Sequence, residues 1–251
     1  AGKTSNNSII KDITLLKEKS FEQILEDIVE QYIGYSDKDL CKQFNRAYNN
    51  NKAQWNDLAC KILGIRDEHA DEFQKANIKV KTIRIEEDGS IRENMSFPPF
   101  KFMDFVREEY ESSTLHDYFE ETRLFFFVWI KDGDVYRVRG CKLWNMPRMD
   151  LETIVKREWE EYQRIVKYGV KFHKCVDRNG KISFTNNLPN KSETQIIHIR
   201  PHAKKAAYRF NNGEEYGNVE RDAILPNGEY MTTQSFWINN GYILEQLKIQ
   251  R

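Results

Sequence analysis

A carboxylate, a short strand and two lysines lie close together in the first third of this 251-residue chain. Six residues separate Glu72 from Lys79, Lys81 follows, and the stretch from Ile78 to Ile85 alternates like a strand. Mg²⁺-dependent cleavage of a phosphodiester needs two acidic groups that bind the metal and a nearby lysine that positions or activates the attacking water. Glu72 would supply the first acid and Lys81 the lysine. Lys79 stands where the second acid should be, and an ammonium group cannot bind a cation. The segment therefore predicts a nuclease-like core whose metal site is degenerate.

A second segment whose residue types could bind a ligand follows the alternating strand predicted at 195–199. The strand delivers Arg200 at its end, Pro201 stops the hydrogen-bonded pairing, and Lys204 and Lys205 come soon after. An arginine held rigidly can donate two hydrogen bonds to O6 and N7 of guanine, while lysines contact phosphates. The same pattern also fits a strand end that carries ordinary solvated bases.

The net charge of zero conceals two opposed blocks. From Glu86 to Glu121 there are eleven acidic residues and three basic ones, whereas from Gln163 to Arg209 there are eleven basic residues and two acidic ones. The excess of nine positive charges in the second block (eleven minus two) is large enough to bind a polyanion. The alternative is a solvated surface that the acidic block balances elsewhere on the protein.

The order of predicted elements indicates an α/β fold with a mixed central sheet flanked by helices. Apolar periodicity predicts helices near 20–33, 36–48, 52–63 and 151–170, with strands near 78–85, 124–130, 135–141 and 195–199. The run 124–130 is wholly apolar, which favours a central strand buried on both faces. A shift of the apolar phase near Thr82 suggests a bulge, and Pro98-Pro99 is expected to precede a further helix. We expect residues 1–19 to be a linker or helix and 20–251 to form one domain.

Composition excludes several classes of protein. Hydrophobic residues make up 39% of the chain, as in a globular domain, and no run of about 18 apolar residues predicts a membrane span. The N-terminus lacks the apolar core of a signal peptide and reads as a linker, so the chain is expected to be a piece of a longer protein. The four cysteines form no CxxC pair, which suits reduced thiols in a cytoplasm. His173 and Cys175 supply too few ligands for zinc.

Several motifs in register resemble the MutH family, which holds the mismatch-repair endonuclease and the type II restriction enzymes that also read GATC. The family has an acid, six residues and then Glu-Leu-Lys-Thr-Ile, where this chain has Glu72, six residues and Lys79-Val80-Lys81-Thr82-Ile83. The further matches run from about Trp55 to Gln250: Val128-Trp129-Ile130, Leu143-Trp144-Asn145, Trp159-Glu160-Glu161, Arg200-Pro201-His202-Ala203 and Leu225-Pro226-Asn227-Gly228-Glu229-Tyr230. Each motif is weak alone, and the series in order is specific.

Two departures decide what the resemblance implies. Members that cut DNA carry glutamate where this chain has Lys79 and aspartate where it has Glu72. The pattern is most similar to the C-terminal half of staphylococcal GATC-specific type II restriction enzymes. That half is a second MutH-like domain, which binds another copy of the site as an allosteric effector, as in the type IIE class. The resemblance thus implies a bacterial cytoplasmic, MutH-like domain that binds double-stranded GATC DNA and is fused behind a catalytic domain.

The implied site residues follow from the same motifs. DNA would be bound through Arg200, Pro201, His202, Lys204, Lys205, Gly228 and Tyr230, with no catalytic residue and no metal or cofactor in this domain. Mg²⁺ would serve the full enzyme. Two alternatives remain open: an active nuclease in which Asp71, Glu86 or Glu87 replaces the missing ligand, and an interaction module whose acidic block docks a basic partner without binding DNA.

Overall fold

A computed structural model describes residues 7–203, 205–218 and 223–247. The chain divides into two compact units, each assembled from segments that are distant in the sequence. Unit 1 consists of Ala1–Glu93, Phe119–Met146 and Leu244–Arg251, and unit 2 of Asn94–Tyr118 and Pro147–Ile243. The sequence predicted one domain from residue 20 onward, because no linker-like composition marks these boundaries.

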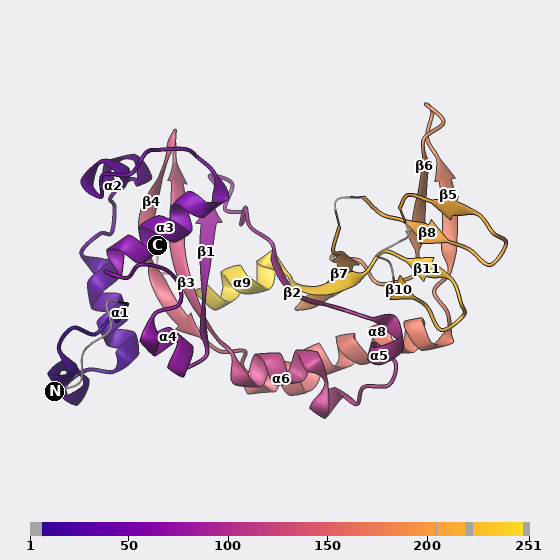
Figure 1. The fold of residues 1–251 in the computed structure, drawn as a ribbon, viewed down its shortest axis with the longest axis horizontal. Coiled ribbons are helices and arrows are strands. Elements are labelled where there is room, and N and C mark those ends of the chain that lie inside the picture. The colour runs from indigo at the N-terminus through magenta and orange to yellow at the C-terminus, as the bar shows by residue number, and fades with distance from the viewer. Residues whose placement is uncertain (1–6, 204, 219–222, 248–251) are drawn as a thin grey trace. The chain divides into compact units, whose positions relative to one another are not determined.

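Unit 1 is built on a mixed three-stranded sheet with the order β1-β3-β4 (Figure 1). Strand β1 (Ile78–Ile85) runs parallel to β3 (Arg123–Asp132), and β4 (Val135–Trp144) pairs with β3 in the antiparallel sense. Residues Leu124 to Trp129 of β3 are all buried, which confirms the central strand that the apolar run predicted. The mixed sheet and the α/β class therefore agree with the sequence prediction.

Two helices of unit 1 begin directly after serine caps, close to the starts at residues 20 and 36 that the sequence predicted. Ser20 and Gln23 form a capping box, and the Ser36 hydroxyl accepts a hydrogen bond from the Asp39 amide. The helices are shorter than the apolar patterns predicted. Their bounds are η1 (Ile13–Lys17), α1 (Phe21–Glu30), α2 (Asp37–Gln43), α3 (Lys52–Ile62) and α4 (Asp71–Lys75).

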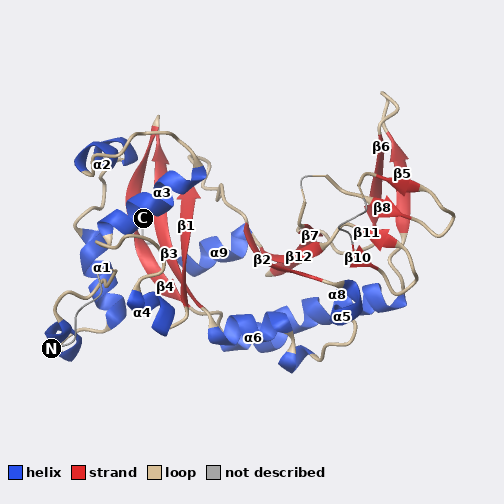
Figure 2. Ribbon diagram, in the orientation of Figure 1, coloured by secondary structure: helices blue, strands red, loops and turns tan. Residues whose placement is uncertain are grey.

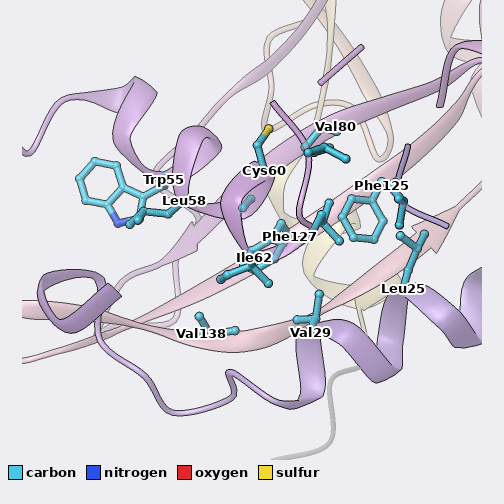
Figure 3. Packing of buried hydrophobic residues seen from close by; sticks show 14 of the residues in the cluster. Leu25, Val29, Trp55, Leu58, Cys60, Ile62, Val80, Phe125, Phe127 and Val138 are labelled. Carbon is cyan, nitrogen blue, oxygen red and sulfur yellow. The ribbon is translucent and has the colours of Figure 1, made fainter. Parts of the chain in front are cut away.

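The core of unit 1 lies between these helices and the sheet. Figure 3 shows Trp55 and Leu58 of α3 beside apolar side chains of α1 and of strands β1, β3 and β4. Trp55, Leu58, Phe125 and Phe127 are completely buried. This packing fixes the sheet against the helices. The backbone that carries Glu72 and Lys79 is therefore held rigidly by the core.

The bulge expected near Thr82 is absent from β1, which was a wrong prediction. Eight consecutive residues of β1 pair with β3, from Ile78 opposite Arg123 to Ile85 opposite Ile130. The apolar phase shifts because Arg84 is buried. Its Nε lies 2.5 Å from Oε1 of Glu93, and its guanidinium carbon lies 3.9 Å from the centre of the Trp55 ring.

Unit 2 contains three further sheets in the described part of the chain (Figure 2). One has the order β2-β12-β7, with β2 at Met95–Phe100, β12 at Gln234–Ile238 and β7 at Ile197–Pro201. Another has the order β10-β11-β8-β9, with bounds Ala223–Ile224, Tyr230–Met231, Tyr208–Arg209 and Glu215–Tyr216. The third is the hairpin of β5 (Phe172–Val176) and β6 (Ile182–Asn186). Pro98 and Pro99 lie inside edge strand β2, where proline is tolerated, and the helix predicted to follow them is present at Phe102–Phe105.

The long helix predicted at 151–170 is present with a modified start. A π-helical turn, η3 (Leu151–Val155), leads into α8 (Lys156–Tyr168), which ends at Gly169 with φ of +117°. The remaining helices are α5 (Phe102–Phe105), η2 (Tyr110–Ser112), α6 (Thr114–Glu121), α7 (Arg148–Asp150) and α9 (Asn240–Leu247). Among the helices that the structure describes, none has the length and apolar character needed to cross a membrane.

Candidate functional site

Glu72, the first acid of the nuclease-like segment, is engaged by the N-terminal part of the chain. Its Oε1 accepts hydrogen bonds from the Ser8 hydroxyl at 2.5 Å and the Ile10 amide at 2.9 Å, and its Oε2 accepts one from the Ile9 amide at 3.0 Å. Burial opposes ionisation of Glu72, but these hydrogen bonds outweigh burial and lower the pKa of the carboxyl group. Both oxygens therefore act as an anchor for residues 8–10.

Asn7 extends the same anchor. Its backbone oxygen accepts a hydrogen bond from the Asp71 amide at 3.2 Å, and its side chain bonds to the Arg66 amide and to Asp67. Residues 1–19 were predicted to be a linker or helix. Within that stretch, Asn7 to Ile10 dock beside α4, and of the described residues Ile13–Lys17 are helical. Nothing in the sequence pattern pointed to this docking, because it joins segments about 60 residues apart.

The residues at the nuclease-like position do not fit a magnesium ion. Mg²⁺ requires oxygen ligands in near-octahedral geometry. Both Glu72 oxygens already accept hydrogen bonds, and the exposed Lys79 offers only donors. Lys81 follows Lys79 by two residues, so both side chains project from the same face of β1, where their charges repel a cation.

The three acids considered as replacements for the missing metal ligand differ in burial and in hydrogen-bond partners. Glu86 Oε1 accepts a hydrogen bond from the Tyr136 hydroxyl at 2.6 Å and lies 3.4 Å from Nη1 of Arg92. Glu87 is exposed in the turn after β1, and Asp71 is half-buried in the first turn of α4 beside Glu72. The Glu86 carboxylate is thus already bound by a tyrosine and an arginine of its own unit.

The described residues of the basic block from Gln163 to Arg209 lie within unit 2, where Arg200 stands near the end of strand β7. The start of β7 is held by Glu158 of α8, which is 7% exposed. The Glu158 carboxylate accepts hydrogen bonds from the backbone amides of Gln195, Ile196 and Ile197, at 2.5, 3.2 and 2.9 Å. Glu158 was not predicted from the sequence, although the adjacent Trp159-Glu160-Glu161 was matched to a family motif.

Arg200 is exposed and stacked on an aromatic ring. Its guanidinium carbon lies 4.6 Å from the centre of the Trp237 ring, and Ser235 of β12 is its partner across the β7–β12 pair. A guanidinium over an aromatic face keeps its outer N–H groups available for hydrogen bonds to a ligand. Trp237 was not predicted; its place in a strand that pairs with β7 is evident only from the fold.

The residues that follow Arg200 are fixed by β12 and the segment before it. Pro201 pairs with Gln234, the His202 amide donates to the Thr233 carbonyl at 2.9 Å, and Nδ1 of His202 lies 3.0 Å from Oγ of the buried Ser235. Lys205 is exposed. Lys204 lies outside the described residues, so its place is a prediction from the sequence alone.

Gly228 and Tyr230 belong to the neighbouring sheet of unit 2. Gly228 has φ of +88° in the turn between β10 and β11, where a residue with a side chain would be strained. Tyr230 in β11 pairs with Arg209 of β8, whose guanidinium carbon lies 5.0 Å from the centre of the Tyr230 ring. Tyr230 therefore stands beside a cation that the sequence identified only as a member of the basic block.

His198 lies buried two residues before Arg200. Burial lowers its pKa to about 4, opposed by a hydrogen bond of 2.6 Å between Nδ1 and Oδ1 of Asn239. His198 is therefore neutral at pH 7 and belongs to the support of β7, not to its exposed end.

Comparison with known proteins shows a similarity to a restriction enzyme. The chain is 32% identical over 265 residues to the type II restriction enzyme Sau3AI from Staphylococcus aureus, and the match covers 96% of this chain and 54% of that enzyme. The chain is related to a restriction enzyme. It spans about half the length of this curated relative. No protein-family model matches the sequence.

Proposed function

We propose that this chain binds double-stranded DNA at GATC sites as the non-catalytic effector domain of a type II restriction endonuclease. The relationship to a restriction enzyme supports a function on DNA. The exposed Arg200, stacked on Trp237 at the end of β7, supports recognition of a base edge in a groove. GATC as the sequence rests on the MutH-like motifs around Arg200 and Tyr230.

One observation carries the non-catalytic part of the proposal. The acid that should bind Mg²⁺, Glu72, instead accepts three hydrogen bonds from residues 8–10, and its would-be partner is Lys79. A carboxylate that holds the chain in place cannot move to a metal without releasing that segment. We therefore assign the chemistry of the full enzyme, including Mg²⁺, to another domain of the same polypeptide.

The division of labour within unit 2 follows from charge and position. Arg200 would donate two hydrogen bonds to guanine, Tyr230 would approach the same groove from the turn at Gly228, and Lys204 and Lys205 would contact phosphates. Pro201 and His202 would shape the backbone between the base reader and the lysines, because both are tied to the 233–235 segment.

A gel-shift measurement tests the proposal directly. The chain should bind a GATC duplex more tightly than a scrambled duplex of equal length, in the presence of EDTA as well as Mg²⁺. Equal affinity for both duplexes would contradict sequence-specific recognition. Absence of binding to either would favour the interaction-module alternative, and site-specific cutting of GATC plasmid by the purified chain would overturn the effector role.

A further inference from the structure

The β5–β6 hairpin of unit 2 stands apart from the residues already assigned. It forms a sheet of its own through five paired positions, from Phe172 opposite Asn186 to Val176 opposite Ile182. Figure 1 shows its connecting loop extending beyond strands β8, β10 and β11 of the same unit. None of the MutH-like motifs lies in this hairpin, and its strands were not predicted from the sequence.

The base of the hairpin is held by aromatic rings. Phe184 lies 4.9 Å from Tyr208, 5.0 Å from Phe210 and 4.8 Å from Tyr216, measured between ring centres. Phe172 adds contacts of 5.5 Å to Tyr208 and 5.4 Å to Phe210. Aromatic rings at these distances prefer particular relative orientations, so these contacts restrict the hairpin more than burial alone would. The hairpin therefore projects from β8 and β9 on a rigid base.

The loop at the tip is ordered by its single acid. Oδ1 of Asp177 accepts hydrogen bonds from the amides of Asn179 at 2.8 Å and Lys181 at 2.9 Å, and Gly180 has φ of +77°. Asp177 is thus occupied by the turn. The exposed Lys171, Arg178 and Lys181 make no ion pair with any other residue in the described part of the chain. Lys174 contacts the Tyr216 hydroxyl at 2.7 Å.

The tip also exposes apolar surface. Val176 is 61% exposed and its cross-strand partner Ile182 is 41% exposed, and because they are paired they project from the same face of the hairpin. An aliphatic pair flanked by arginine and lysine on a stiff arm suits one class of partner. Nucleic-acid grooves offer phosphates to the cations and sugar or base surfaces to the aliphatic groups.

We propose that this hairpin is a second DNA-contacting element, which lies along the duplex outside the base-reading site. The inference rests on the proposed function, because it takes double-stranded DNA as the partner. Arg178 and Lys181 bind phosphates of the flanking sequence, and Val176 with Ile182 packs against the groove. These contacts carry no sequence information, so they raise affinity for any duplex long enough to reach the tip.

Salt titrations of DNA binding test the inference. The variant with Arg178→Ala and Lys181→Ala should reduce the slope of log affinity against log salt by about 1.8, at about 0.9 for each phosphate that the variant no longer neutralises. Its ratio of affinities for GATC and scrambled duplexes should stay that of the wild type. A matched control removes two exposed cations from unit 1, Lys17→Ala with Lys42→Ala, and should leave the slope unchanged.

A second variant separates apolar packing from charge. Val176→Thr with Ile182→Thr keeps β-branched side chains and all cations, so it should lower affinity roughly fivefold to tenfold without changing the salt slope. A GATC duplex truncated to the site itself should bind wild type and both hairpin variants equally.

The outcomes distinguish two failures. If the wild type binds no DNA, the proposed function fails and the hairpin proposal fails with it. If the wild type prefers GATC, but the charge variant keeps its salt slope and the threonine variant its affinity on long duplexes, the hairpin proposal alone is overturned. An equal fall in the salt slope of the unit 1 control would also overturn the hairpin proposal. The change in slope would then reflect the net charge of the protein and not a contact made by the hairpin.

Discussion

The guanidinium of Arg200 lies over the ring of Trp237, with 4.6 Å between the guanidinium carbon and the ring centre. The two residues come from adjacent antiparallel strands, β7 and β12, where Trp237 pairs with His198 and Ser235 with Arg200. Stacking restricts the long arginine side chain before any ligand arrives. The proposed hydrogen bonds from Arg200 to a base would therefore lose less conformational entropy.

Arg200→Ala should cost roughly 1–3 kcal/mol of discrimination between a GATC duplex and a duplex with the guanine replaced. Arg200→Lys should lose much of the same discrimination while keeping phosphate attraction, because lysine cannot donate through a rigid planar fork. Competition gel shifts measure both. If Arg200 is an ordinary surface residue, Arg200→Ala will change stability by no more than about 0.5 kcal/mol and leave binding as it was.

Neutralising Lys204 and Lys205 together should weaken binding to GATC and scrambled duplexes by similar factors. The salt slope should fall by about 0.9 for each phosphate that these lysines neutralise in the wild type. Fluorescence anisotropy at several salt concentrations provides the measurement. In a full-length enzyme the same change should slow cleavage without altering the catalytic domain, because the effector site would be filled less often. An unchanged salt slope would mean that the two lysines are merely solvated.

The isolated chain should show no Mg²⁺-dependent cleavage of GATC plasmid. Restoring the acids with Lys79→Glu and Glu72→Asp should not create activity, because the shorter aspartate still faces the donors of residues 8–10 and the surrounding residues are not arranged for a metal. Agarose gels of plasmid incubated with Mg²⁺ and Mn²⁺ provide the readout. Robust cutting at GATC by the unmodified chain would contradict this expectation.

Glu72→Gln should lower the free energy of unfolding by about 1–3 kcal/mol at pH 7, because an ionised acceptor of three hydrogen bonds is removed. The folded-state pKa of Glu72 lies below its ordinary value of 4.5, so its contribution is fully present above about pH 4.5 and is lost as pH falls through the lowered value. The difference in free energy of unfolding between wild type and Glu72→Gln should therefore become smaller at acidic pH. Denaturant titrations at several pH values measure it, and Glu68→Gln, a glutamate of the same unit outside this hydrogen-bond set, is the control. A constant gap from about pH 7 to about pH 3 would contradict the assignment.

Glu158→Gln should disturb the presentation of Arg200 as well as stability. A glutamine places an N–H₂ group against backbone donors of residues 195–197, so roughly 2 kcal/mol or more of stability should be lost. Discrimination for GATC should fall further than the loss of folded protein explains, since the start of β7 is released. Glu160→Gln, two residues along α8 and exposed, should change neither property. If folded Glu158→Gln protein discriminates between GATC and scrambled duplexes as well as the wild type does, Glu158 has a structural role only.

Local sequence determined the elements whose patterns are short-range. The apolar run at 124–130 predicted the buried central strand because a strand covered on both faces needs no polar alternation. The helices predicted from residues 20 and 36 begin there, with Ser20 and Ser36 as caps, because a cap acts within three residues of its own position. The identity of Lys79 by itself excluded a second carboxylate at that position, whatever the fold.

Tertiary structure decided the relationships that join distant segments. The sequence places Glu72 in a nuclease-like motif, but only the fold brings Ser8, Ile9 and Ile10 to its carboxylate. Pattern also could not foresee that Arg84 would be buried against Glu93, so it suggested a bulge in a strand that pairs without interruption. Trp237 beneath Arg200 and Glu158 behind β7 depend on pairing and packing between segments about 37 to 39 residues apart. Such contacts leave no periodic signal in the sequence, because periodicity records which face of an element is buried and not what lies against it.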